Sequence, residues 1–150
     1  IGPIQSNKTR AIASHFDWVH SVDRVKIARR FNEQRPAHLP PLQVCLQVNI
    51  SGETSKSGVT PEELPQLAQE VSQLPHLQLR GLMAIPSATP DKEHQQDAFA
   101  QLHTAFTQLR SQFPQLDTLS MGMSGDMEAA IAEGATIVRI GTALFGSRNR

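Results

Sequence analysis

Short apolar runs alternate along the chain with longer stretches whose apolar residues recur at helical spacing. The runs predict strands near residues 18–22, 43–50, 77–85, 117–121 and 136–140. The stretches between them predict helices over 5–16, 24–34 and 127–133, and two more that open at Thr60 and Thr89. Strands and helices that alternate in this way imply a parallel sheet covered by helices.

The predicted helices carry recognisable start and stop signals. Thr60-Pro61-Glu62-Glu63 has the spacing of a capping box, with proline at the first helical position. Asp23 is placed to cap the helix over 24–34, and Gly134 stands where a left-handed C-cap residue belongs. The helix that opens at Thr89 should bury one apolar stripe, made of Phe99, Leu102, Phe106, Leu109 and Phe113.

The strand over 43–50 decides between an open sheet and a barrel, because its apolar residues alternate with Cys45, Gln47 and Asn49. A central strand of an open parallel sheet is apolar on both faces. A barrel strand can point apolar residues outward at helices and polar ones into the lumen. We therefore predict an α/β fold, with residues 1–150 forming a single domain that is a partial (β/α)8 barrel. Five complete strands and a strand stub at Ile1-Gly2-Pro3 leave roughly three of eight strands absent or incomplete.

Composition narrows the classes of function. Lys+Arg and Asp+Glu both number 14, so the chain has no basic excess that would favour nucleic acid or an anionic membrane surface. Its longest apolar runs are too short to span a bilayer. Cys45 is the only cysteine, which excludes an internal disulfide and favours a reducing, cytoplasmic compartment. The six histidines show no metal-ligand spacing.

Two glycine-bearing turns follow the last two predicted strands. The first is Gly122-Met123-Ser124-Gly125-Asp126, and the second begins with Gly141-Thr142. Small residues at the carboxyl ends of adjacent strands offer free backbone N–H groups and close approach, which a phosphate group needs. In (β/α) barrels the loops after the last two strands often build such a site. We therefore expect a phosphorylated small molecule here.

Three side chains near these turns have competing interpretations. Arg139 shares a strand face with Gly141 and should point into the lumen, either beside the ligand or toward an ion-pair partner, since a bare buried charge is costly. Ser124 is placed to cap the short helix, to donate to a phosphate, or to do both. Asp126 would repel a phosphate, so we expect it to face away.

Further candidates lie on the earlier loops of the same mouth. Asn49 ends its strand on the lumen side, as a site residue or as a residue that caps the following loop. That loop, SGETSKSG, carries Lys56, either as a solvated side chain or as an amine that could meet an aldehyde or an anion. Met83 should line the barrel.

The strings IGPIQSNK, HSVD, QVNISGETSKSG, RGLMAIP, SMGMSGDMEAAI and VRIGTALFG closely resemble the pyridoxal 5′-phosphate homeostasis protein family. The resemblance covers essentially the whole chain in order. It implies a pyridoxal 5′-phosphate (PLP) protein of fold type III, similar to the N-terminal domain of alanine racemase standing alone. Such a protein is cytoplasmic, has no established catalytic activity, and buffers PLP or delivers it, with PLP-dependent apoenzymes as candidate recipients.

The resemblance also implies roles for particular residues. It puts Ser124, Gly141 and Thr142, with the backbone near Met123, at the PLP phosphate, and Arg139 against the pyridine nitrogen. The family's Schiff-base lysine lies on the first barrel strand, which would precede Ile1. None of the lysines of this chain matches that lysine's motif; they are Lys8, Lys26, Lys56 and Lys92.

Two other functions remain open on the sequence. One is a PLP-dependent amino-acid racemase-like enzyme, which needs the Schiff-base lysine and a second base. The other is a barrel enzyme that uses the same phosphate loops for a phosphorylated metabolite without PLP. Because an arginine cannot accept a proton, an arginine at the ring nitrogen leaves PLP a weak electron sink and favours binding over catalysis.

Overall fold

The computed structural model describes residues 1–54 and 56–149, and a curved sheet of parallel strands forms its centre. The strands are β1 (Trp18–Val22), β2 (Leu42–Gln47), β3 (Leu77–Met83), β4 (Thr118–Met123) and β5 (Ile137–Arg139). They lie side by side in chain order, β1-β2-β3-β4-β5, and every neighbouring pair is parallel. A sheet that advances strand by strand in one direction is the wall of a barrel, whereas a doubly wound sheet reverses its order.

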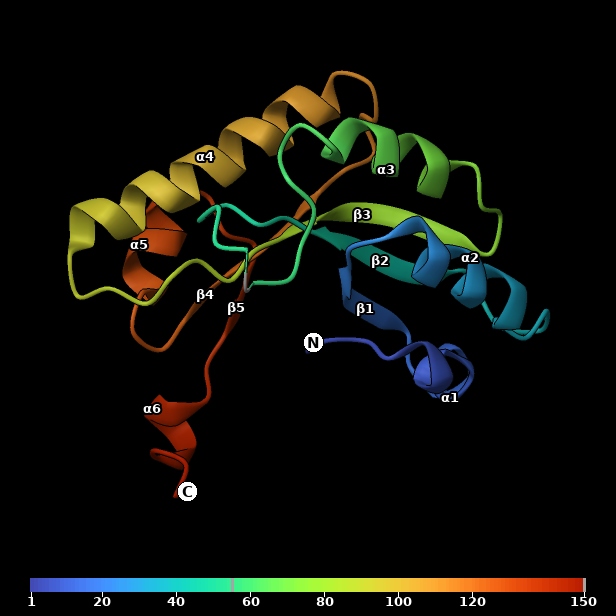
Figure 1. Ribbon diagram of the computed structural model, residues 1–150, viewed down its shortest axis with the longest axis horizontal. Coiled ribbons are helices and arrows are strands. Elements are labelled where there is room, and N and C mark those ends of the chain that lie inside the picture. The colour runs from blue at the N-terminus through green and yellow to red at the C-terminus, as the bar shows by residue number, and fades with distance from the viewer. Residues whose placement is uncertain (55, 150) are drawn as a thin grey trace.

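Helices lie before, between and after these strands, and those between the strands connect one strand to the next. They are α1 (Thr9–His15), α2 (Val25–Gln34), α3 (Leu64–Ser72), α4 (Lys92–Arg110), α5 (Met127–Ala132) and α6 (Thr142–Phe145), with a 3-10 turn, η1 (Ser6–Lys8), before α1. Figure 1 shows α3 and α4 along one side of the curved sheet, with the N-terminal end and α6 on the other. The predicted partial barrel is confirmed.

The core lies between the helices and the outer face of the sheet. In β2 the residues Leu42, Val44 and Leu46 belong to this core, while Cys45 and Gln47 alternate with them on the inner face. The predicted alternation of core-facing apolar residues with residues on the inner face is therefore confirmed in β2. All five residues of the predicted apolar stripe are buried: Phe99, Leu102, Phe106 and Leu109 in α4, and Phe113 just after its end.

The inner face of the sheet is polar and well paired at the amino ends of the strands. The guanidinium of Arg80 donates to both carboxylate oxygens of Asp117 at 3.0 and 2.8 Å and to the side-chain oxygen of Gln43 at 2.9 Å. The same guanidinium lies 4.6 Å from the ring centre of Trp18. These contacts connect β1, β2 and β3 to the residue before β4. The polar side chains at this end of the sheet therefore stabilise the fold.

Strand boundaries differ from the predicted ones where loops leave the sheet. The strand predicted over 43–50 ends at Gln47, because Val48 forms a separate parallel bridge with Val59. Gly58 permits that return: its φ is +119°, and a Cβ there would lie 2.7 Å from the backbone nitrogen of Asn49. The strand predicted over 77–85 ends at Met83, and those over 117–121 and 136–140 shift by one or two residues.

Helix ends gave mixed outcomes. The capping box is confirmed by the reciprocal bonds between Thr60 and Glu63, although α3 itself begins at Leu64. Gly134 has the expected positive φ, +97°. The predicted cap at Asp23 is wrong, because Arg24 takes the N-cap position of α2 with no side-chain bond. The helix α6 was not predicted, because the sequence analysis assigned its residues to the second glycine turn.

Candidate functional site

An open pocket of about 860 Å³ lies at the carboxyl ends of the strands. The loops after β3, β4 and β5 form most of its wall, together with Lys56 from the loop after β2. It brings together five of the seven predicted site residues, namely Met123, Ser124, Arg139, Gly141 and Thr142. The two glycine turns therefore meet at one place, as the order of the last two strands required.

Ser124 joins the two turns. Its hydroxyl oxygen accepts the backbone N–H of Gly141 at 3.3 Å and that of Ala143 at 3.1 Å. The expectation that Ser124 caps the short helix is wrong, because α5 begins after Asp126 with no side-chain cap. A hydroxyl that already gathers N–H groups from the next loop lies where an anion would find donors from both loops.

Arg139 extends from β5 toward the pocket and is incompletely paired. Its Nη2 donates to the carbonyl oxygen of Ala84 at 2.9 Å, while its Nε and Nη1 are buried without a hydrogen-bond partner. The alternative role as an ion-pair partner finds no support, since no ion pair among residues 1–54 and 56–149 includes Arg139. Burial lowers the pKa of its guanidinium, while the negative charge of Asp126 opposes that shift.

Buried donors without acceptors are rare in folded proteins. A guanidinium cannot lose its proton to relieve the cost, so a ligand acceptor is the natural partner for the two free N–H directions of Arg139. The residue lines the pocket together with the two glycine turns.

Asp126 does not face away from the pocket as expected. It lines the pocket wall, and its Oδ1 accepts the backbone N–H of Met123 at 2.7 Å. The sequence contained a signal for this bond, because a side chain that reaches back to the N–H three residues earlier is one half of a capping box. The carboxylate thus stands within the predicted anion site.

The two remaining candidates lie outside the main pocket. Asn49 holds the loop after β2, since its amide donates to the carbonyl of Glu53 at 2.7 Å and its Oδ1 accepts the N–H of Gly52 at 3.1 Å. That geometry matches the loop-capping alternative. Met83 is fully buried and lines a smaller neighbouring cavity of about 220 Å³, which shares Lys56 and Ile85 with the main pocket. Residue 55 of this loop lies outside the described residues.

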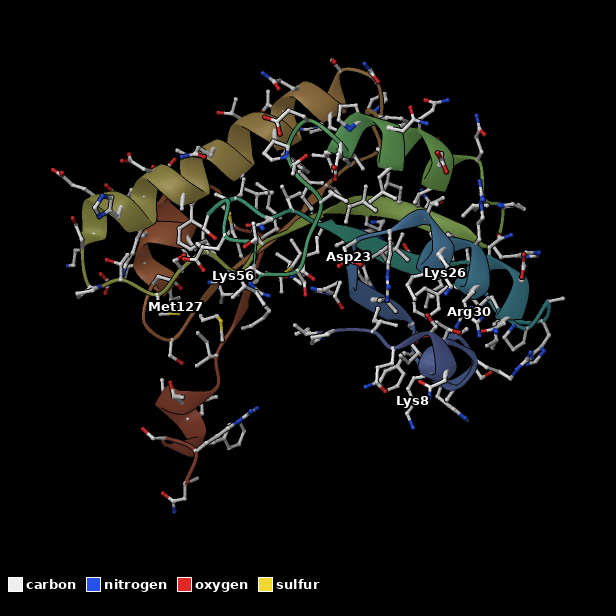
Figure 2. The ribbon with its side chains drawn as sticks, in the orientation of Figure 1. Lys8, Asp23, Lys26, Arg30, Lys56 and Met127 are labelled. Carbon is white, nitrogen blue, oxygen red and sulfur yellow. The ribbon has the colours of Figure 1, made fainter. Side chains whose placement is uncertain are left out.

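Lys56 is the one lysine among the described residues that lines either cavity. Lys8 lies in η1 and Lys26 in α2, both on the outer layer, and Lys92 begins α4. Figure 2 shows Lys8, Lys26 and Arg30 grouped at α1 and α2, apart from Lys56.

A buried polar pair on the inner face escaped the sequence analysis. His20 of β1 and Ser120 of β4 share a hydrogen bond of 2.8 Å between Nδ1 and Oγ. Burial lowers the pKa of His20, and the positive charge of Arg139 lowers it further. The signal in the sequence was the position of His20 in an apolar run that predicts a strand. His20 does not line the pocket.

Two kinds of feature were not found among the described residues. Across 1–54 and 56–149, His, Cys, Asp and Glu side chains form no group of three that could hold a metal ion. In the same ranges, the helices are all too short or too polar to cross a membrane.

The fold and the pocket define a class of protein. The family model described as "Alanine racemase, N-terminal domain" matches residues 1–149, and the chain belongs to that family. A relative in Pseudomonas aeruginosa, called a pyridoxal phosphate homeostasis protein, is 68% identical over 149 residues, which are 99% of this chain and 64% of the relative. This chain thus spans 64% of the length of that relative.

Solved structures agree with this assignment. PipY of Synechococcus elongatus PCC7942, solved without PLP, is 41% identical with a TM-score of 0.89, over 97% of this chain and 69% of PipY. PipY with PLP bound gives 40% identity and a TM-score of 0.86, over 97% of this chain and 68% of PipY. Alanine racemase of Clostridium difficile 630 shares the fold at 18% identity and a TM-score of 0.75, over 100% of this chain and 39% of the racemase.

Proposed function

We propose that this chain binds PLP through its phosphate and ring nitrogen, and that the protein buffers or delivers PLP inside the cell without catalysis. The observation that carries the proposal is Arg139, whose buried guanidinium has two unpartnered nitrogens on the wall of the pocket that the glycine turns enclose. A cation with free donors beside a phosphate-type site fits a ligand with an anionic group and a ring acceptor.

The residues present fit PLP at both ends of the molecule. Ser124, Gly141 and Thr142, with the backbone near Met123, would hold the phosphate, because hydroxyl and backbone N–H groups from two loops converge there. Arg139 would donate to the pyridine nitrogen. We do not assign Asn49 to the ligand, because its side chain is engaged in the loop after β2.

The proposal of binding without catalysis rests on what Arg139 can do with a proton. When bound, PLP supplies an electrophilic aldehyde and a ring that can accept electrons. A guanidinium donates hydrogen bonds but does not give up its proton, so Arg139 would hold the ring nitrogen unprotonated and weaken that electron sink. His20 offers no acid or base to the pocket, since it is paired with Ser120 away from the pocket wall.

The names of the relatives support the same function. The Pseudomonas aeruginosa relative is called a pyridoxal phosphate homeostasis protein, and PipY has been solved with PLP bound. We propose PLP-dependent apoenzymes as the recipients of the delivered cofactor. We also propose a cytoplasmic location, because the single thiol, Cys45, is free and buried.

Equilibrium dialysis of PLP against the intact protein that carries this sequence tests the proposal. We expect saturable PLP binding that inorganic phosphate competes away, and much weaker binding of pyridoxal, which lacks the phosphate. Alanine in deuterated solvent should show no α-hydrogen exchange; exchange would favour the racemase-like alternative. Phosphate binding without PLP binding would favour an enzyme of a phosphorylated metabolite.

A further inference from the structure

The pocket that is proposed to hold a phosphate contains a carboxylate. Asp126 is the acidic residue on its wall within the described part of the chain, where the basic residues are Lys56, Arg139 and Arg148. An acidic side chain in an anion site is unfavourable for binding, because like charges at short range repel. Its presence therefore calls for a physical role.

Asp126 uses a donor that the anion would also use. Its Oδ1 accepts the N–H of Met123 at 2.7 Å, and its own N–H donates to the carbonyl of Met123 at 3.2 Å. The two bonds close the turn over residues 123–126. An anion that approaches the Met123 N–H must replace the carboxylate or remain beside it.

Asp126 also acts on the cation of the site. Its charge is the largest one opposing the effect of burial on Arg139, although the two side chains form no ion pair. The carboxylate thus competes with a bound phosphate in two ways: it takes a backbone donor, and its field offsets that of the guanidinium.

We propose that Asp126 sets the phosphate affinity of the pocket below what its donors would otherwise give, and so allows a bound phosphate ester to leave. This inference rests on the proposed function, since a protein that delivers PLP must release it. Ser124 gathers the N–H groups of Gly141 and Ala143 without adding charge. Among the described residues of this wall, Asp126 combines a donor-occupying bond with a negative charge.

The substitution Asp126→Asn separates charge from geometry. Asparagine keeps a side-chain oxygen that can accept the Met123 N–H, so the turn is retained while the negative charge is removed. We expect the intact protein with this change to bind inorganic phosphate and PLP about three- to tenfold more tightly, as loss of one repulsive charge at a few ångströms in a wet site predicts. PLP release should slow correspondingly, and the affinity for pyridoxal, which lacks the phosphate, should rise less than that for PLP.

Two further variants complete the test. Glu128→Gln removes the same charge from an exposed position on α5 that does not line the pocket, and should leave both affinities within about twofold of wild type. Asp126→Glu keeps the charge, so it should not tighten binding.

Unchanged or weaker phosphate binding in a folded Asp126→Asn protein would overturn the inference, as would equal tightening in Glu128→Gln. If wild type and all variants bind neither phosphate nor PLP, the proposed function itself fails. That result differs from equal, measurable affinities in wild type and Asp126→Asn, which refute only the role of Asp126.

Discussion

Arg139, the last residue of β5, donates from Nη2 to the carbonyl oxygen of Ala84, which follows β3, at 2.9 Å. The strand β4 lies between β3 and β5 in the sheet. The side chain of Arg139 therefore crosses the inner face of the sheet and is fixed from both sides of β4. One donor direction is used in the anchor, and the buried Nε and Nη1 remain for another acceptor. The position of the cation is thus set before any ligand binds.

Arg139→Gln should weaken PLP binding and speed PLP release in the intact protein. Loss of a buried hydrogen bond from a charged donor costs about 1–3 kcal/mol of binding free energy, while the phosphate contacts remain. Melting temperatures with and without PLP check the result. We expect the drop to be confined to the PLP-bound form; an equal drop in both forms would mean that Arg139 is only structural.

Arg80→Gln is the matched control for that experiment. Arg80 also lies on the inner face, but its partners are Asp117, Gln43 and the ring of Trp18 at the other end of the strands. Its substitution should lower the melting temperature by the same amount with and without PLP and leave PLP affinity unchanged.

Gly141→Val should reduce phosphate and PLP affinity without destabilising the fold. A Cβ at position 141 would meet no atom within 4 Å, and the φ of Gly141, −121°, lies outside the left-handed region that favours glycine. The added side chain would therefore occupy the space that a phosphate needs for close backbone approach. We expect a smaller loss for Gly141→Ala than for Gly141→Val by titration calorimetry; unchanged affinity in both would remove the phosphate assignment.

His20 should make the folded state sensitive to mild acid. Burial lowers the pKa of His20 from its ordinary 6.5, so below about that pH the unfolded chain binds a proton that the folded chain does not. This contribution to stability is present above the unfolded pKa and is lost as the pH falls toward the lower folded value. Urea unfolding between pH 8 and pH 5 should show wild type losing more stability than His20→Asn. Parallel losses would contradict the assignment.

Much of the fold could be predicted because its signals are local. The apolar stripe of α4, the capping box of Thr60 and Glu63 and the left-handed Gly134 each depend on residues within a few positions of one another. The alternation in β2 even reported which face meets the helices. The end of β2 could not be predicted in this way, because it depends on the bridge between Val48 and Val59, eleven positions along the chain.

The same difference between local and long-range signals explains which features of the site could be predicted. The sequence by itself determined that two glycine turns follow adjacent strands, that Arg139 shares a face with Gly141, and that the chain resembles a PLP-binding family. Only the tertiary structure decided what each side chain contacts: Ser124 bridges to Ala143, Asn49 holds its own loop, and Asp126 enters the pocket. Backbone periodicity fixes the direction in which a residue points, whereas hydrogen-bond partners depend on where separate loops come to lie after the sheet has curved.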